Sequence, residues 1–239
     1  MLEKLLKKIK PLKRSTWLPL VEEGDGGLSD SKFAGTPWLN KGDKWPICPM
    51  CNKPLQFFLQ LNLDELLEGI RGRFGSGILQ MFYCLNCEPE CCEVLAEAWW
   101  PFAKSELIRV IQPTEPAERI DLPDFESPFP PKRIVGWEQK DDYPHYDDLR
   151  EMKAELTDDE IQALWDAGYP RPGEKLGGYP LWVQSLEYPN CPICDKRMEL
   201  VFQIDSEQNL PTMWGDAGIG HITQCPEHKA QVAFGWACH

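Results

Sequence analysis

The chain has 239 residues, of which 42% are hydrophobic and 26% charged, which is ordinary usage for a globular protein and unlike a disordered one. Its 38 acidic residues outnumber 25 basic ones, and the net charge of −13 argues against binding of nucleic acid duplexes through their phosphates. No apolar stretch approaches the roughly 18 residues of a membrane span, and lysines interrupt the apolar start that a secretion signal needs. We therefore expect a cytoplasmic protein whose cysteines are thiols or metal ligands.

The first predicted element is a basic amphipathic helix, which opens an N-terminal segment over residues 1–32. Residues 1–14 carry a charge of +5, and one helix face would present four apolar side chains: Leu2, Leu5, Leu6 and Ile9. We expect this helix to dock on the rest of the protein. The alternative is a helix that binds a membrane surface or a partner.

Two cysteine pairs in the first half of the chain have the spacing of a zinc site. Each pair is a C-x-x-C knuckle, and 32 residues separate the pairs: Cys48, Cys51, Cys84 and Cys87. The two-residue gap lets one turn present both sulfurs to a single ion. Apolar residues alternate from Leu55 to Leu63, so a strand, a loop and a second strand would return the chain to the second pair.

The second half of the chain repeats this pattern, with one imidazole in place of a thiol: Cys191, Cys194, Cys225 and His228. In both halves a glutamine, Gln60 or Gln203, lies twelve residues after the first cysteine. Gly77 and Gly218 each lie seven residues before the next ligand cysteine. These shared spacings indicate an internal duplication.

The predicted fold is α+β and mostly β, with two tandem β-rich repeats that share a mixed sheet, each carrying a zinc knuckle pair. The repeats would span residues 33–111 and 176–239, with a third strand near residues 96–100 and 230–236. Residues 112–175 between them predict a Pro-rich loop followed by an acidic helical insert.

The insert is expected to contain two short helices. Residues 147–156 predict the first, and nine acidic residues lie between positions 141 and 160. Thr157 and Glu160 have the spacing of a capping box at the start of the second helix, which Gly168 would end.

Each predicted metal site fills all four positions with protein ligands and leaves none for water. Closed zinc sites stabilise folds and rarely catalyse, so we expect two structural zinc ions. A redox C-x-x-C would open a helix, whereas strands are expected here, and independent buried thiols would not need paired spacing. Three further cysteines are expected to be buried thiols: Cys91, Cys92 and Cys238.

The chain shows no recognisable catalytic motif. His145, in an acidic and Tyr-rich loop, and His221, on a predicted strand, are the two histidines that could serve as a base. The simpler interpretations are a solvated loop residue for His145, and for His221 a residue of the core or beside the metal ligands.

Eight segments resemble the YwqG-like family of bacterial proteins of unknown function. In the first half these are residues 32–38, 45–46, 54–61 and 77–82, and in the second half residues 176–180, 203–205, 214–216 and 224–228. That family is similar in turn to the eukaryotic programmed cell death protein 2 group. The resemblance implies a tandem β-rich fold with a large mixed sheet and cytosolic work, in the eukaryotic group as chaperones for a basic ribosomal protein. It also implies an association with RNA processing. It supplies no catalytic residue, and YwqG-like proteins lack the cysteine pairs.

We expect a zinc-stabilised, non-enzymatic protein-interaction module that binds a basic protein, as a chaperone or as an antitoxin or immunity protein. Long-range attraction would speed the encounter, and aromatic side chains would anchor it. Besides the acids of 141–160, the candidate contacts, each with core packing as its alternative, are Trp99, Trp100, Trp137, Tyr143, Tyr146 and Trp214. One other reading is an RNA-associated processing factor using the basic N-terminus with Arg71 and Arg73. The other is a hydrolase or transferase of unknown chemistry.

Overall fold

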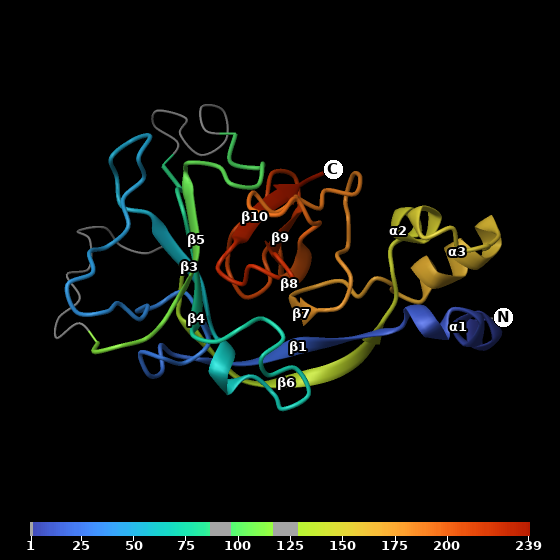
Figure 1. Cartoon of the computed structure of the whole chain (residues 1–239), viewed down its shortest axis with the longest axis horizontal. Coiled ribbons are helices and arrows are strands. Elements are labelled where there is room, and N and C mark those ends of the chain that lie inside the picture. Colours follow the sequence, from blue (N-terminus) through green and yellow to red (C-terminus); the bar gives the residue numbers. More distant parts are fainter. Residues whose placement is uncertain (1, 87–96, 117–128) are drawn as a thin grey trace.

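The computed structural model describes residues 2–86, 97–116 and 129–239. Its strands form one antiparallel ten-stranded sheet in the order β10-β9-β8-β7-β1-β6-β2-β3-β4-β5, curled so that its two edge strands approach each other (Figure 1). The strands are β1 (Arg14–Glu23), β2 (Lys32–Phe33), β3 (Gln56–Asn62), β4 (Ile78–Tyr83), β5 (Glu106–Ile111), β6 (Lys132–Asp142), β7 (Lys175–Gly177), β8 (Glu199–Asp205), β9 (Ile219–Gln224) and β10 (Val232–Ala237). The helices are α1 (Leu2–Lys8), α2 (Tyr146–Glu151) and α3 (Asp158–Asp166), with short 3-10 turns at Lys10–Leu12 and Leu63–Glu65. None of the described helices has the length and apolar character needed to cross a membrane.

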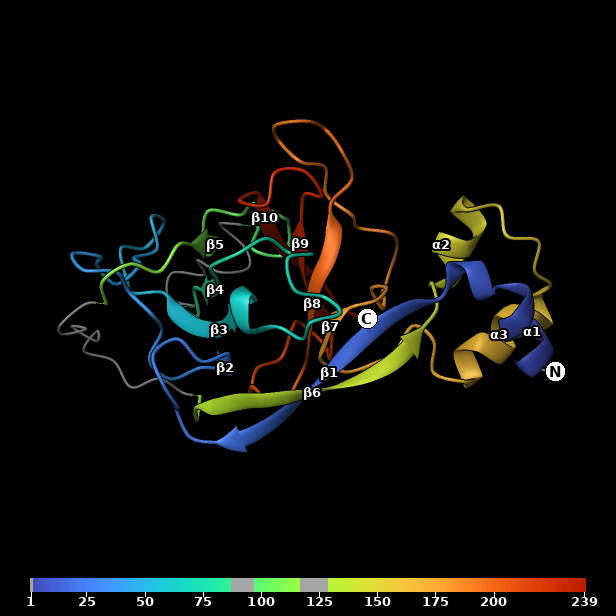
Figure 2. The same ribbon diagram turned by 60° about the horizontal axis from the view of Figure 1, so that its bottom comes forward.

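A long ribbon of β1 and β6 forms the centre of the sheet. Figure 2 shows the ribbon running from the helices along one side of the molecule. β7 pairs with the free edge of β1, whereas β2 pairs with the free edge of β6. Neither ribbon strand was anticipated from the sequence, because Pro19 interrupts β1 and charged residues fill most of β6.

The strands on the two sides of this ribbon, β2-β3-β4 and β7-β8-β9, pair in matching registers. Lys32 of β2 is paired with Gln60 of β3, and Lys175 of β7 is paired with Gln203 of β8. The next strand places Gln80 opposite Gln60 and His221 opposite Gln203. Each ladder also shifts register at one matching place, between Phe57 and Leu59 in the first and between Leu200 and Phe202 in the second.

A buried lysine holds each of these ladders to an end of the ribbon. Lys32 Nζ lies 2.9 Å from Asp25 Oδ1, just past β1, and Lys175 Nζ lies 2.9 Å from Asp142 Oδ2, the last residue of β6. Both lysine side chains are fully buried, and a backbone amide also donates to each carboxylate. Gly178 is required beside Asp142, because a Cβ there would lie 2.4 Å from the carboxylate and its φ is +77°.

The concave face of the sheet encloses the main core, which is rich in aromatic side chains. Trp214 packs against Phe58, Tyr83 and Phe234 with ring centroids 4.9 to 5.6 Å apart. The two edges of the sheet approach each other at this core: the amide of Trp236 in β10 donates to the carbonyl of Trp99, in a turn before β5, 3.1 Å away. This contact nearly closes the sheet into a barrel.

The helices form a second, smaller core at one end of the ribbon. Leu5 and Ile9 of the N-terminal segment are 2% and 4% exposed and pack with Leu149 and Leu164 of α2 and α3. The N-terminal helix is therefore docked on the insert. The predicted capping box is confirmed, since Thr157 and Glu160 exchange side-chain and backbone hydrogen bonds at the start of α3.

Three sequence expectations differ from the structure. The sheet is antiparallel in every described pairing, not mixed. The third strand of the first half is Glu106–Ile111 and not residues 96–100, of which the described part is a turn. The first insert helix is shorter than residues 147–156 and ends at Glu151, since Lys153 adopts a φ of 55° that an α-helix cannot continue.

Candidate metal centres and an aromatic pocket

Four side chains of the second half converge on one point. Cys191 and Cys194 lie on the turn before β8, Cys225 directly follows β9, and His228 lies on the next turn. Their ligand atoms all lie within 4.8 Å of one another. Cys194 Sγ is 3.6 Å from Cys225 Sγ, and His228 Nδ1 is 3.8 and 3.7 Å from the sulfurs of Cys191 and Cys225.

These separations fit a tetrahedral ion. With metal–sulfur bonds of about 2.3 Å, the edges of a regular tetrahedron measure about 3.8 Å, close to the observed spacings. Three thiolates and one imidazole nitrogen complete such a shell, so the cluster could hold a metal ion with no position left for water.

Backbone amides around the cluster favour thiolates. The amides of Glu227 and His228 donate to Cys225 Sγ at 3.4 and 3.2 Å, and the amide of Ile193 donates to Cys191 Sγ at 3.4 Å. Although burial opposes it, hydrogen bonds from the amides of His228 and Glu227 lower the pKa of the Cys225 thiol to about 6. The turn that presents the first two sulfurs needs a left-handed residue, and Asp195 supplies it with a φ of 58°.

The first half brings together Cys48, Cys51 and Cys84 in the same way. Their sulfurs lie within 4.8 Å of one another, with Cys51 and Cys84 3.7 Å apart, and Asn52 has the same φ of 58° as its counterpart. Burial raises the pKa of the Cys84 thiol, which a metal ion would counteract by binding the thiolate. Three cysteines lie outside the described residues, including the expected fourth ligand: Cys87, Cys91 and Cys92.

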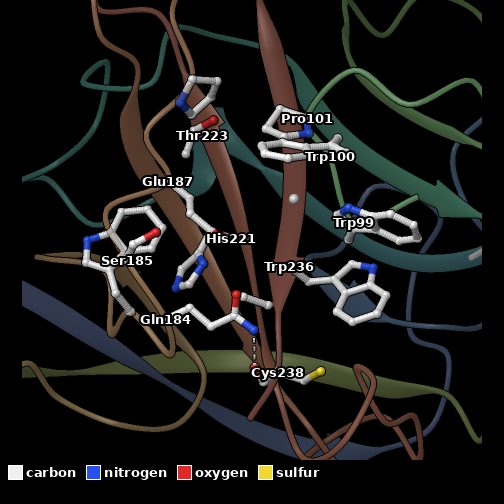
Figure 3. A pocket seen from close by; sticks show the side chains of 14 residues that line it. Trp99, Trp100, Pro101, Gln184, Ser185, Glu187, His221, Thr223, Trp236 and Cys238 are labelled. Carbon is white, nitrogen blue, oxygen red and sulfur yellow. Dashed lines mark hydrogen bonds between the residues drawn. The ribbon is translucent and has the colours of Figure 1, made fainter. Parts of the chain in front are cut away.

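A pocket of about 550 Å³ lies beside the second cluster, over β9 and β10. Figure 3 shows Trp99, Trp100 and Pro101 on one side of it, and His221 with Glu187 on the other. Trp100 is 56% exposed, whereas His221 is 4% exposed. The pocket is thus an aromatic opening with a buried imidazole among its lining residues.

Small residues of the second half create this space. Pairing places Gly235 opposite His221, where the first half has Arg109 opposite Gln80. Thr223 correspondingly occupies the position of Phe82. In the first half bulky side chains occupy these positions, and the Arg109 guanidinium lies 5.7 Å from the centre of the Phe82 ring.

The six aromatic residues expected at a partner surface are dispersed. Trp99 and Trp100 line the pocket. Tyr146 begins α2, and its ring contacts the His145 ring in a tilted arrangement with centroids 4.0 Å apart.

The remaining three pack against other aromatic rings. Trp137 of β6 lies edge-on to Phe202, with ring centroids 6.4 Å apart. Tyr143 and Trp214 are only 4% and 2% exposed and belong to the helical and main cores. A surface-bound partner would not reach these two, and partner contact at the other four stays a prediction.

His145 is not a solvated loop residue. It is 2% exposed, and its Nδ1 accepts a hydrogen bond of 3.4 Å from the amide of Asp147 as the cap of α2. Burial lowers the pKa of His145, which fits this capping role of a neutral imidazole. Cys238 is partly buried and lines the pocket.

Sequence reasoning missed the buried lysines and the pocket. The lysines had a detectable signal, because Lys32 and Lys175 are separated by the same interval as Cys48 and Cys191. The pocket had none, because it depends on side chains that are absent at Gly235 and small at Thr223.

Residues 31–237 match the family model described as a domain of unknown function, DUF1963. Because the match covers most of the chain, the protein belongs to this family. No curated protein matches the chain.

Proposed function

We propose that this protein is a zinc-stabilised, non-enzymatic interaction module of the cytoplasm that binds a basic protein partner. The observation that carries the proposal is the net charge of −13. Among the described acidic residues, most are at least partly exposed, and those buried as whole residues are Asp142, Asp148 and Glu174. Such a surface attracts cationic partners over a distance and speeds their encounter.

Zinc is the metal that suits the two clusters. Tetrahedral sets of thiolates with an imidazole are typical of structural zinc, and the ion would join the ends of paired strands that are far apart in sequence. In the first half the ion would hold the turn before β3 to the residues that follow β4, and in the second half the turn before β8 to the residues that follow β9. A closed set supports a role in stability, and this favours a binding protein over a metalloenzyme.

The two halves fit an internal duplication. The matched registers, the two register shifts, the lysine–carboxylate pairs and the two cysteine turns all support a common ancestor for the halves. The resemblance to YwqG-like proteins and to the programmed cell death protein 2 group adds the expectation of a chaperone-like role toward a basic client. An antitoxin or immunity role uses the same acidic surface.

The RNA reading gains no support from the basic residues that suggested it. Lys8 pairs with Glu160 and Lys13 with Asp141, each at 3.0 Å. Burial lowers the pKa of Arg73, which also lies 3.9 Å from Glu199.

Capture of the tagged full-length protein from its native host, with and without nuclease, tests the proposal. We expect one basic protein to be recovered equally from both samples and to bind the purified protein directly. Changing Glu155, Asp158 and Asp159 of the insert to amides should weaken that binding. The matched control changes three exposed acids elsewhere, Glu3, Glu65 and Glu68, and should weaken it less. Recovery that disappears with nuclease would contradict the proposal and favour an RNA-associated role.

A further inference from the structure

The pocket beside β9 and β10 combines hydrogen-bonding side chains with several indole rings. No lysine or arginine is among the described residues that line it. Its ionisable groups include the carboxylate of Glu187 and the imidazole of His221. Of these two groups, the carboxylate can only accept hydrogen bonds when ionised, so it favours a ligand with N–H or O–H donors.

His221 presents an unused lone pair. Burial, with the nearby Lys175 cation, lowers the pKa of His221 to about 3, so the ring is neutral. Its hydrogen bond to the backbone of Leu181 favours protonation, which identifies a ring N–H as the donor. Nε2 is buried and has no partner among the described residues, so it is the remaining acceptor.

Glu187 is a partly buried carboxylate without a counterion. No ion pair or hydrogen bond joins its side chain to any described residue, and burial raises the pKa of Glu187. A cation placed beside it would replace the lost hydration. The Glu187 carboxylate therefore favours a hydrogen-bond donor that also carries a positive charge.

Aromatic rings also line this pocket. Trp99 and Trp100 lie across the pocket from His221 in Figure 3, and Trp182 packs on the His221 ring with centroids 4.7 Å apart. Indole faces attract organic cations, with arginine the most frequent partner in proteins.

We propose that this pocket binds a guanidinium group, presented by an arginine side chain of the basic partner. The donors of the guanidinium would reach Glu187 and the Nε2 of His221, and its flat face would stack on the exposed Trp100. This inference rests on the proposed function, because the arginine is assigned to a protein.

Titration of the full-length protein with N-acetyl-arginine amide, followed by the indole N–H signals in NMR, tests the site. We expect saturable shifts of the pocket tryptophans, and at least tenfold weaker binding of the neutral analogue N-acetyl-citrulline amide. Equal binding of the two amides, the absence of saturation, or shifts confined to other tryptophans would overturn the proposal.

Four variants locate the interaction. Glu187→Gln should weaken binding of the arginine amide about tenfold, whereas Glu68→Gln, an exposed acid elsewhere, should leave it unchanged. Trp100→Ala should weaken it about fivefold, and Trp165→Ala, which removes another exposed indole, should not.

Two further variants replace a pocket residue of the second half with the residue at the equivalent position of the first half. Thr223→Phe places the residue of position 82 in the pocket and should abolish binding, with folding checked by the melting temperature. His221→Gln, the residue of position 80, retains an amide that can bond the Leu181 carbonyl, as Gln80 bonds Trp38, and should weaken binding. Wild-type affinity in both variants would overturn the proposal.

The two proposals fail in different ways. If a basic protein binds wild type and Thr223→Phe equally, the pocket assignment is wrong and the interaction module stands. If the arginine amide binds as expected but no basic protein is captured, the proposed function is wrong and the pocket remains a guanidinium site.

Discussion

The indole N–H of Trp236 donates to the hydroxyl of Tyr83 at 3.0 Å, joining β10 to β4 where the two edges of the sheet approach each other. Both residues are less than a tenth exposed, at 8% and 4%. The bond therefore satisfies a donor that water cannot reach.

Tyr83→Phe should lower the free energy of unfolding by about 1–3 kcal/mol, because it leaves the buried indole N–H without this acceptor. Urea denaturation followed by tryptophan fluorescence measures the change. Tyr146→Phe is the control, since the Tyr146 hydroxyl has no hydrogen bond among the described residues, and it should be nearly neutral. Equal stabilities for the two variants would show that the contact between the two sheet edges does not depend on this hydrogen bond.

Removing the carboxylate charge should destabilise the protein to different extents at the two lysine–carboxylate pairs. Asp142 and Lys175 are both fully buried, whereas Asp25 keeps 35% of its side chain exposed. Asp142→Asn should therefore cost about 3–5 kcal/mol, because it strands a buried ammonium group, and Asp25→Asn should cost less.

A double variant separates charge from packing at this site. Lys175→Met combined with Asp142→Asn should recover part of the lost stability, since no unpaired charge then remains. The free energy of unfolding of each variant, measured at equilibrium, tests this recovery. A double variant less stable than Asp142→Asn alone would contradict the prediction.

Because Glu174 is buried, we expect the stability of the protein to fall as pH rises. Burial, against the opposing hydrogen bonds from Asn209, raises the pKa of Glu174 to about 7. The folded state therefore holds a proton that the unfolded state has released above about pH 4.3, and stability declines through pH 7 by up to about 3 kcal/mol. Glu174→Gln should flatten this decline and should be more stable than wild type at pH 8. Urea midpoints between pH 5 and 8 test it, and parallel profiles for the two proteins would refute the assignment.

Metal content should follow the two clusters independently. Intact-mass measurement under native conditions should show two zinc ions per chain. Cys51→Ser and Cys194→Ser should each leave one, whereas Cys238→Ser, which changes a cysteine outside both clusters, should leave two. Chelation should lower the melting temperature, and added zinc should restore it. A metal-free native protein would contradict the assignment.

Local patterns in the sequence were enough to predict strands β3 and β8 and the convergence of the described cluster residues, whereas Cys87 lies outside the described residues. Alternating apolar residues predicted β3 and β8. The C-x-x-C spacing predicted that Cys191 and Cys194 lie close to Cys225, as they do. The ribbon was missed because its strands are stabilised by pairing with distant strands, and Pro19 contradicts the usual strand pattern. His145 was misplaced because its burial depends on packing that no local pattern records.

The crossed attachment of the ribbon has a consequence for biosynthesis. β1 precedes the first half of the chain, yet its free edge takes β7 of the second, while β6 follows the first half and takes β2 of that half. When the first half leaves the ribosome, β1 still has no neighbour, and it stays so until β6 is made from Lys132 onward. Because the main core draws side chains from both halves, we expect folding to be completed only after the second half is made, and the nascent chain carries the unpaired β1 until β6 is available.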